Sequence, residues 1–95
     1  MQTEKQVLES CVRWGVVAKY SEVVQGSDKA SGAYCRFYTL QKVLELPYSA
    51  QCKGLSIEEL ESFCENLSKY ALDSDLELQE VFQSLDLTDL ENKLK

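Results

Sequence analysis

Cysteines are the residues of this chain best suited to nucleophilic or metal-binding chemistry. They stand at positions 11, 35, 52 and 64, and the sequence contains no histidine. Structural zinc sites pair their ligands a few residues apart, and a cysteine nucleophile of the Cys–His type needs a histidine base. We therefore expect no metal site and no such catalysis. Cys52, beside the cationic Lys53, is predicted to be the most reactive thiol, whereas Cys11 and Cys64 fall on apolar stripes and should be core residues.

Sixteen Asp and Glu side chains could supply acid–base chemistry if two of them shared a pocket. Such catalysis depends on surroundings that shift the pKa values of the pair. The sequence pattern instead puts the acids on exposed faces of predicted helices. The glycines, at positions 15, 26, 32 and 54, match no phosphate-binding fingerprint. We expect a protein that is not an enzyme and that binds no cofactor.

The net charge of −6 is concentrated in the second half of the chain. Residues 1–53 carry seven basic and five acidic side chains, whereas residues 54–95 carry three basic and eleven acidic ones. This argues against direct binding to nucleic acid, which selects clustered Lys and Arg. The acids would suit a basic partner surface, or they are simply solvated faces that keep the protein soluble. The predicted acidic surface comprises Glu58, Glu61, Glu65, Asp73, Asp75 and Glu77.

The N-terminus has no uninterrupted apolar run. We therefore expect neither a signal peptide nor a membrane span. The acidic second half of the chain argues against binding to an anionic membrane. We accordingly expect the protein to be located in the cytoplasm.

Aromatic residues gather around one arginine between Tyr34 and Tyr38. Tyr34, Phe37 and Tyr38 surround Arg36, and on an exposed face this composition is typical of a protein-interface hot spot. The same cluster could stack nucleic-acid bases, although one arginine in an acidic protein is weak support for that. In the alternative interpretation, Phe37 and one tyrosine belong to the core and the rest is coincidence.

The segment before this cluster carries more apolar residues than one helix face can bury. Thr3 and Gln6 form a capping-box pattern that predicts a helix start. From residue 16 onward, valines and a tyrosine also occupy the face that is polar in the first turns. Either the helix continues to Gln25 and ends at Gly26, or a strand follows and pairs back as a β-hairpin across residues 16–38. The predicted partner-binding residues are Val16, Val17, Tyr20, Val24, Tyr34, Arg36 and Tyr38.

The clearest helix signal lies between residues 55 and 72. Ser56 and Glu59 have the spacing of a capping box, and Leu55 with Leu60 that of a hydrophobic staple. An apolar stripe follows at three- and four-residue steps, which predicts one buried helix face. Its members are Leu60, Phe63, Cys64, Leu67 and Ala71.

Shorter elements complete the predicted arrangement. Residues 25–32 have the composition of a loop, and a helix over residues 39–46 should end at Pro47, which begins a connector to Gly54. Another amphipathic helix is expected over residues 78–85. Thr88 and Glu91 repeat the capping-box pattern before a short last helix.

These patterns predict one all-α domain over residues 1–95, a compact bundle of four to five helices. An α+β fold with the hairpin across residues 16–38 is the alternative. The function we expect is that of a non-enzymatic interaction module, which dimerises or docks on a partner protein through an apolar and aromatic face. The alternative function is a small acidic inhibitor from a mobile element or phage, which would block a protein complex that handles nucleic acid.

Overall fold

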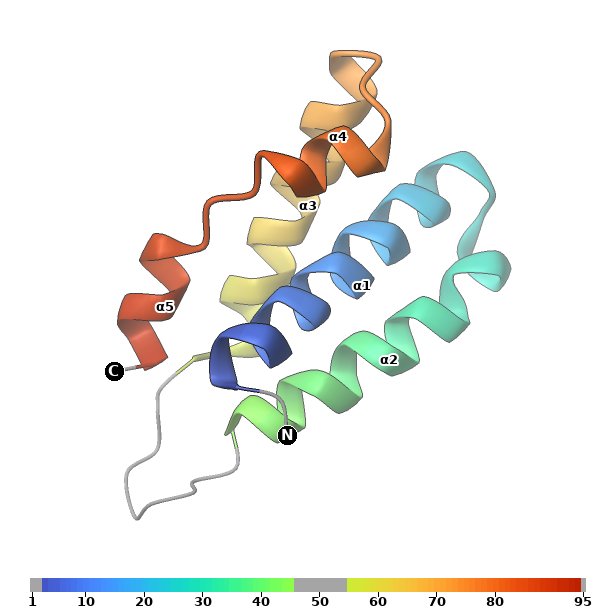
Figure 1. Ribbon diagram of the computed structural model, residues 1–95. Coiled ribbons are helices and arrows are strands. Elements are labelled where there is room, and N and C mark those ends of the chain that lie inside the picture. The colour runs from blue at the N-terminus through green and yellow to red at the C-terminus, as the bar shows by residue number, and fades with distance from the viewer. Residues whose placement is uncertain (1–2, 46–54, 95) are drawn as a thin grey trace.

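Five helices make up the computed structural model, which describes residues 3–45 and 55–94 (Figure 1). They are α1 (Glu4–Val24), α2 (Ser27–Glu45), α3 (Ile57–Asp73), α4 (Leu78–Gln83) and α5 (Thr88–Leu94). The described residues contain no strand, so the all-α prediction is confirmed and the hairpin across residues 16–38 is wrong. The predicted connector from residue 47 to residue 54, with Cys52, lies outside the described residues.

Helix α1 is continuous, and both of its ends follow the local signals in the sequence. The Thr3 Oγ1 accepts from the Gln6 amide at 3.2 Å, and the Gln6 side chain accepts from the Thr3 amide at 2.9 Å. At the other end Gly26 has a φ of 97°, a conformation that costs glycine little and other residues more. Gly26 therefore turns the chain directly into α2.

The predicted loop over residues 25–32 is wrong beyond Gly26, because α2 already begins at Ser27. Ala30 and Ala33 are buried in the first turns of α2 and face the bundle core. Small side chains let two helices approach closely, and the carboxylate of Asp28 suits the positive end of the helix dipole. Packing against α1 thus stabilises a helix in a segment whose Ser and Gly content is typical of a loop.

Helix α1 lies between α2 and α3 and packs against both (Figure 1). At Gly15 the backbone of α1 lies against one residue of each neighbouring helix. A Cβ atom added there would lie 2.8 Å from the Phe37 ring of α2 and closer still to the Cys64 sulfur of α3. Because α1 has a neighbour on each side, its apolar residues are distributed around it rather than along one stripe. The fully buried residues of α1 are Leu8, Cys11, Val12, Val16 and Ala18.

The start of α3 satisfies half of the predicted capping box. The Ser56 Oγ accepts from the Glu59 amide at 3.2 Å, as predicted. The Glu59 carboxylate does not return to the Ser56 amide. Its Oε1 accepts from the Ser56 hydroxyl at 3.2 Å, and its Oε2 pairs with Lys93 of α5. Glu59 therefore also joins α3 to the last helix.

The apolar stripe of α3 is buried in large part as predicted. Leu60, Cys64 and Ala71 lie in the core, whereas Phe63 and Leu67 are only partly buried. Ser68 is buried as well and donates to the Glu65 carbonyl within its own helix at 2.9 Å. That bond lets a hydroxyl occupy an apolar position.

Two short helices cover the rest of the core. Val81 of α4 and Leu90 and Leu94 of α5 are buried, and Lys5 of α1 pairs with Glu91 of α5 at 3.7 Å. The predicted capping box at Thr88 is wrong. Thr88 is instead the first residue of α5, and the Asp86 Oδ1 accepts from its amide at 3.0 Å. Among the described residues, no helix is long and apolar enough to cross a membrane.

Asp75 lies just after the end of α3 and has a backbone conformation better suited to glycine. Its φ is 56°, and the Leu76 amide donates to the Ala71 carbonyl at 3.0 Å, which defines a Schellman cap. We expect Asp75→Gly to raise the free energy of unfolding by about 0.5 to 1 kcal/mol, because the left-handed region costs a residue with a Cβ atom. Urea titration measures this.

A matched control for that prediction is Asp73→Gly, which removes the same charge from the last residue of α3. Glycine at a helical position should lower the free energy of unfolding by about 0.5 to 1 kcal/mol. Equal shifts of the same sign in the two variants would mean that charge, and not backbone conformation, determines the effect.

Candidate interaction surface

The predicted partner-binding residues of α1 do not form one exposed face. Val16 is fully buried between the helices, so it is a core residue and not part of a contact surface. Val17 and Tyr20 are half-buried, and Val24 is exposed at the end of the helix. Only part of the apolar surplus in this segment is therefore buried inside the fold, where α1 is the central helix.

The predicted aromatic cluster on α2 is divided between two flanks of the helix. The Tyr34 and Tyr38 rings are four residues apart and stack with centroids 5.9 Å apart. Arg36 points the other way, and its guanidinium lies 4.5 Å from the centroid of the Trp14 ring. Phe37 is buried between the flanks. A five-residue cluster in sequence thus contributes to two surfaces and to the core.

Each tyrosine is paired with a carboxylate from a different helix. The Tyr34 hydroxyl donates to Glu22 of α1, and the Tyr38 hydroxyl lies near the Glu61 carboxylate of α3. Partial burial is the largest cause that raises the pKa of both tyrosines above the ordinary value, and the nearby carboxylates raise it further. The Lys19 ammonium lies 5.5 Å from the centroid of the Tyr34 ring. Side chains of three helices therefore meet around the two rings.

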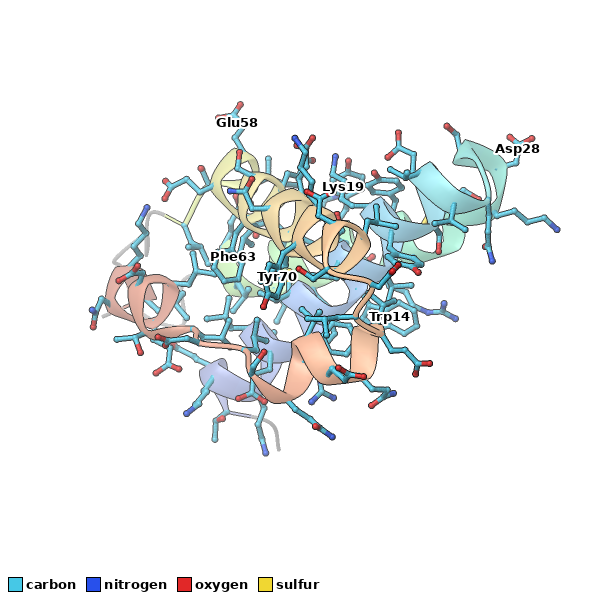
Figure 2. All side chains as sticks on the ribbon, turned by 90° about the horizontal axis from the view of Figure 1, so that it is seen from above. Trp14, Lys19, Asp28, Glu58, Phe63 and Tyr70 are labelled. Carbon is cyan, nitrogen blue, oxygen red and sulfur yellow. The ribbon has the colours of Figure 1, made fainter. Side chains whose placement is uncertain are left out.

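These residues lie along an open groove that runs over α1 between α2 and α3. It consists of two adjoining cavities of about 440 and 530 Å³. Lys19 and Glu22 line both of them. We call it the α2–α3 groove; its α2 wall contains Tyr34, Cys35 and Tyr38, and its α3 wall contains Glu65, Lys69 and Leu72. In Figure 2, Glu58 stands at the top, Lys19 lies below it beside α3, and Trp14 lies lower and to the right.

The predicted acidic surface overlaps this groove in part. Glu65 and Asp73 line it, and Glu61 reaches it through Tyr38. Glu58 is exposed one turn before Glu61 on the same side of α3. The two remaining predicted acids, Asp75 and Glu77, lie after the end of α3 in the turn to α4. The structure therefore brings aromatic and acidic residues that the sequence analysis treated separately into one place.

Lys19 and Glu22, which line both parts of the groove, are not singled out by the sequence patterns above. Lys19 and Glu22 follow Gly15 at steps of four and three, so all three share one face of α1. This spacing is the feature of the sequence that could have predicted that Lys19 and Glu22 lie on the same face as Gly15. Gly15 is buried where α2 and α3 converge, and the face opens to solvent one turn further on.

Another cavity, on the α4 and α5 side, offers less to a partner. It measures about 370 Å³, and three of the charged residues that line it already have partners. Lys5 pairs with Glu91, and the Arg13 guanidinium lies 5.6 Å from the centroid of the Phe82 ring. We therefore place the candidate site at the α2–α3 groove.

The described thiols are structural with one exception. Cys11 donates to the Phe37 carbonyl at 3.6 Å, and Cys64 donates to the Val12 carbonyl at 3.5 Å. Burial raises the pKa of Cys11 to about 12 and raises that of Cys64 too, so both are neutral core groups as predicted. Cys35 is exposed on the groove wall. Within residues 3–45 and 55–94, no three potential ligands are grouped to hold a metal ion.

No family model matches this sequence, and no curated protein or solved structure matches it significantly. The architecture therefore defines the class of this protein. It is a small all-α bundle in which a central helix packs against two long helices, and two short helices follow them in the described part of the chain.

Proposed function

We propose that this chain is a non-enzymatic interaction module that docks on a partner protein through the α2–α3 groove. The observation that supports this most is that one face combines two stacked tyrosines, an apolar cavity lining and a charged rim. Tyrosine gives a large contact area at a low cost in conformational entropy, and it is enriched at binding hot spots. Val23, exposed beside the groove, would extend the apolar contact.

A second candidate function is that of an acidic inhibitor carried by a phage or mobile element. It is favoured by the carboxylates on and beside the groove, Glu58, Glu61, Glu65 and Asp73. A protein complex that handles nucleic acid presents basic surfaces to the phosphates. An acidic face could occupy such a surface in place of nucleic acid, and the attraction would weaken with salt. Both candidates use the same groove and differ in the partner.

A photo-crosslinking experiment tests the docking face. The photoreactive residue p-benzoylphenylalanine replaces Tyr38 in one variant and Tyr70 in the other, expressed in cells of the source organism. Both tyrosines are solvent-exposed, by 39% and 54%, but Tyr70 lies on α3 away from the groove. We expect irradiation to yield a defined heavier adduct from the Tyr38 variant alone, identified by mass spectrometry.

The nature of the adduct separates the alternatives. An adduct with a second copy of the chain would identify a homodimer, and one with a different protein would identify the docking partner. Adducts from both positions alike, or from Tyr70 alone, would contradict the assignment of the groove.

A further inference from the structure

The α2–α3 groove already holds one positive charge on its aromatic wall. The Lys19 ammonium lies over the Tyr34 ring at 5.5 Å from the centroid. An ammonium or guanidinium at that distance from an aromatic face is attracted by the negative electron density of the ring. Tyr38 stacks on Tyr34 and is the more exposed of the two rings, so it extends the same kind of surface away from Lys19.

Carboxylates surround these rings with unused acceptor capacity. Each carboxylate has about four acceptor positions; the Tyr34 hydroxyl occupies one on Glu22, and Glu61 lies near the Tyr38 hydroxyl. Glu65 and Asp73 continue the negative rim, and the positive side chains lining the groove are Lys19 and Lys69. The groove thus combines aromatic faces with an excess of negative charge.

We infer that the natural occupant of the groove is an arginine-bearing segment of the partner protein, with a guanidinium over Tyr38 and its N–H groups directed to Glu61 and Glu65. This inference rests on the proposed function and specifies its partner. Arginine suits the site better than lysine because its planar group stacks on an aromatic ring and bonds carboxylates in a forked geometry.

Lys19 is then an internal competitor for the incoming cation. It neutralises part of the rim and occupies the Tyr34 face. Removing its charge while keeping its length, in Lys19→Met, should therefore strengthen binding of a cationic peptide. A purely structural role for the Lys19 contact gives no reason for such a gain.

The test measures binding of a fluorescent nona-arginine peptide by anisotropy at low salt, with a Gly-Ser peptide of equal length as the reference. We expect binding of the arginine peptide alone. Glu61→Gln with Glu65→Gln should weaken it about tenfold, because paired carboxylates are lost. Glu77→Gln with Glu80→Gln removes equal charge from residues outside the groove and should weaken it by less than about threefold. Circular dichroism checks that every variant keeps its helices.

Lys19→Met should tighten binding about three- to fivefold, whereas Lys29→Met, which removes an exposed charge near the start of α2, should change it by less than about twofold. Three results would each overturn the inference: no preference for the arginine peptide, equal losses in the two glutamine pairs, or equal effects of the two lysine variants. If these occur while the Tyr38 crosslink still captures a partner, the docking function stands and only the cationic occupant is wrong.

Discussion

Replacing Gly15 with alanine should lower the free energy of unfolding by about 2 kcal/mol or more, or about 10 °C in melting temperature. The new methyl carbon would lie 2.8 Å from two atoms of the Phe37 ring and nearer still to the Cys64 sulfur. Both neighbours are fully buried and belong to different helices, so neither can move aside without displacing α2 or α3. The helix propensity of alanine returns only about 1 kcal/mol.

The chain offers a control of the same chemistry at Gly32, which is exposed within α2. A Cβ atom there would have no neighbour within 4 Å. Gly32→Ala should therefore raise the free energy of unfolding by about 0.5 to 1 kcal/mol, the opposite sign. Urea titrations followed by circular dichroism measure both variants. If Gly15→Ala proved as stable as Gly32→Ala, the close approach of the three helices at Gly15 would be disproved.

A double-variant cycle assigns the clash to its partner. Cys64→Ala removes the sulfur that lies nearest to the added methyl group. In that background Gly15→Ala should cost less than in the natural chain, because part of the clash is gone. Identical costs in the two backgrounds would leave the Phe37 ring as the whole cause.

Alkylation at pH 8 should modify Cys35 at least about a thousandfold faster than Cys11 or Cys64. Cys35 is exposed on α2, whereas the other two thiols are buried and donate to backbone carbonyls. The thiolate is the reactive form, and burial raises the pKa of Cys11 from 9.0 to about 12. Iodoacetamide labelling in a Cys52→Ser background, read by peptide mass spectrometry, measures the three described thiols.

The buried thiols also make stability depend on alkaline pH. A raised pKa in the folded state means that the unfolded chain loses its thiol protons first as the pH increases. The contribution of Cys11 to stability is therefore complete below about pH 9 and declines as the pH rises toward 12.

The control for the alkylation experiment is labelling in 8 M urea, where all three thiols should react alike. Rapid labelling of Cys64 in the native protein would contradict its burial.

The two predictions are linked through unfolding. If the buried thiols react only when the chain opens, Gly15→Ala should speed labelling of Cys64 by the factor that its stability loss implies. For about 2 kcal/mol this factor is roughly thirtyfold.

Local residue patterns determined several features of this protein without help from the fold. Thr3 with Gln6 starts α1 and Gly26 ends it, because capping bonds and a positive φ involve only neighbouring residues. The apolar stripe of α3 likewise followed from helical periodicity. Local composition failed at residues 27–32, where burial of Ala30 and Ala33 against the bundle outweighs the loop tendency of Ser and Gly.

The candidate site required the tertiary structure. Periodicity puts Tyr34 and Tyr38 on one side of α2, but only packing brings Glu22 and Glu61 to their hydroxyls. The same packing buries Val16, which sequence analysis had assigned to a contact face. Periodicity determines which residues share a face of a helix, whereas the neighbour of each face depends on how α2 and α3 meet at Gly15, a contact between residues far apart in the chain.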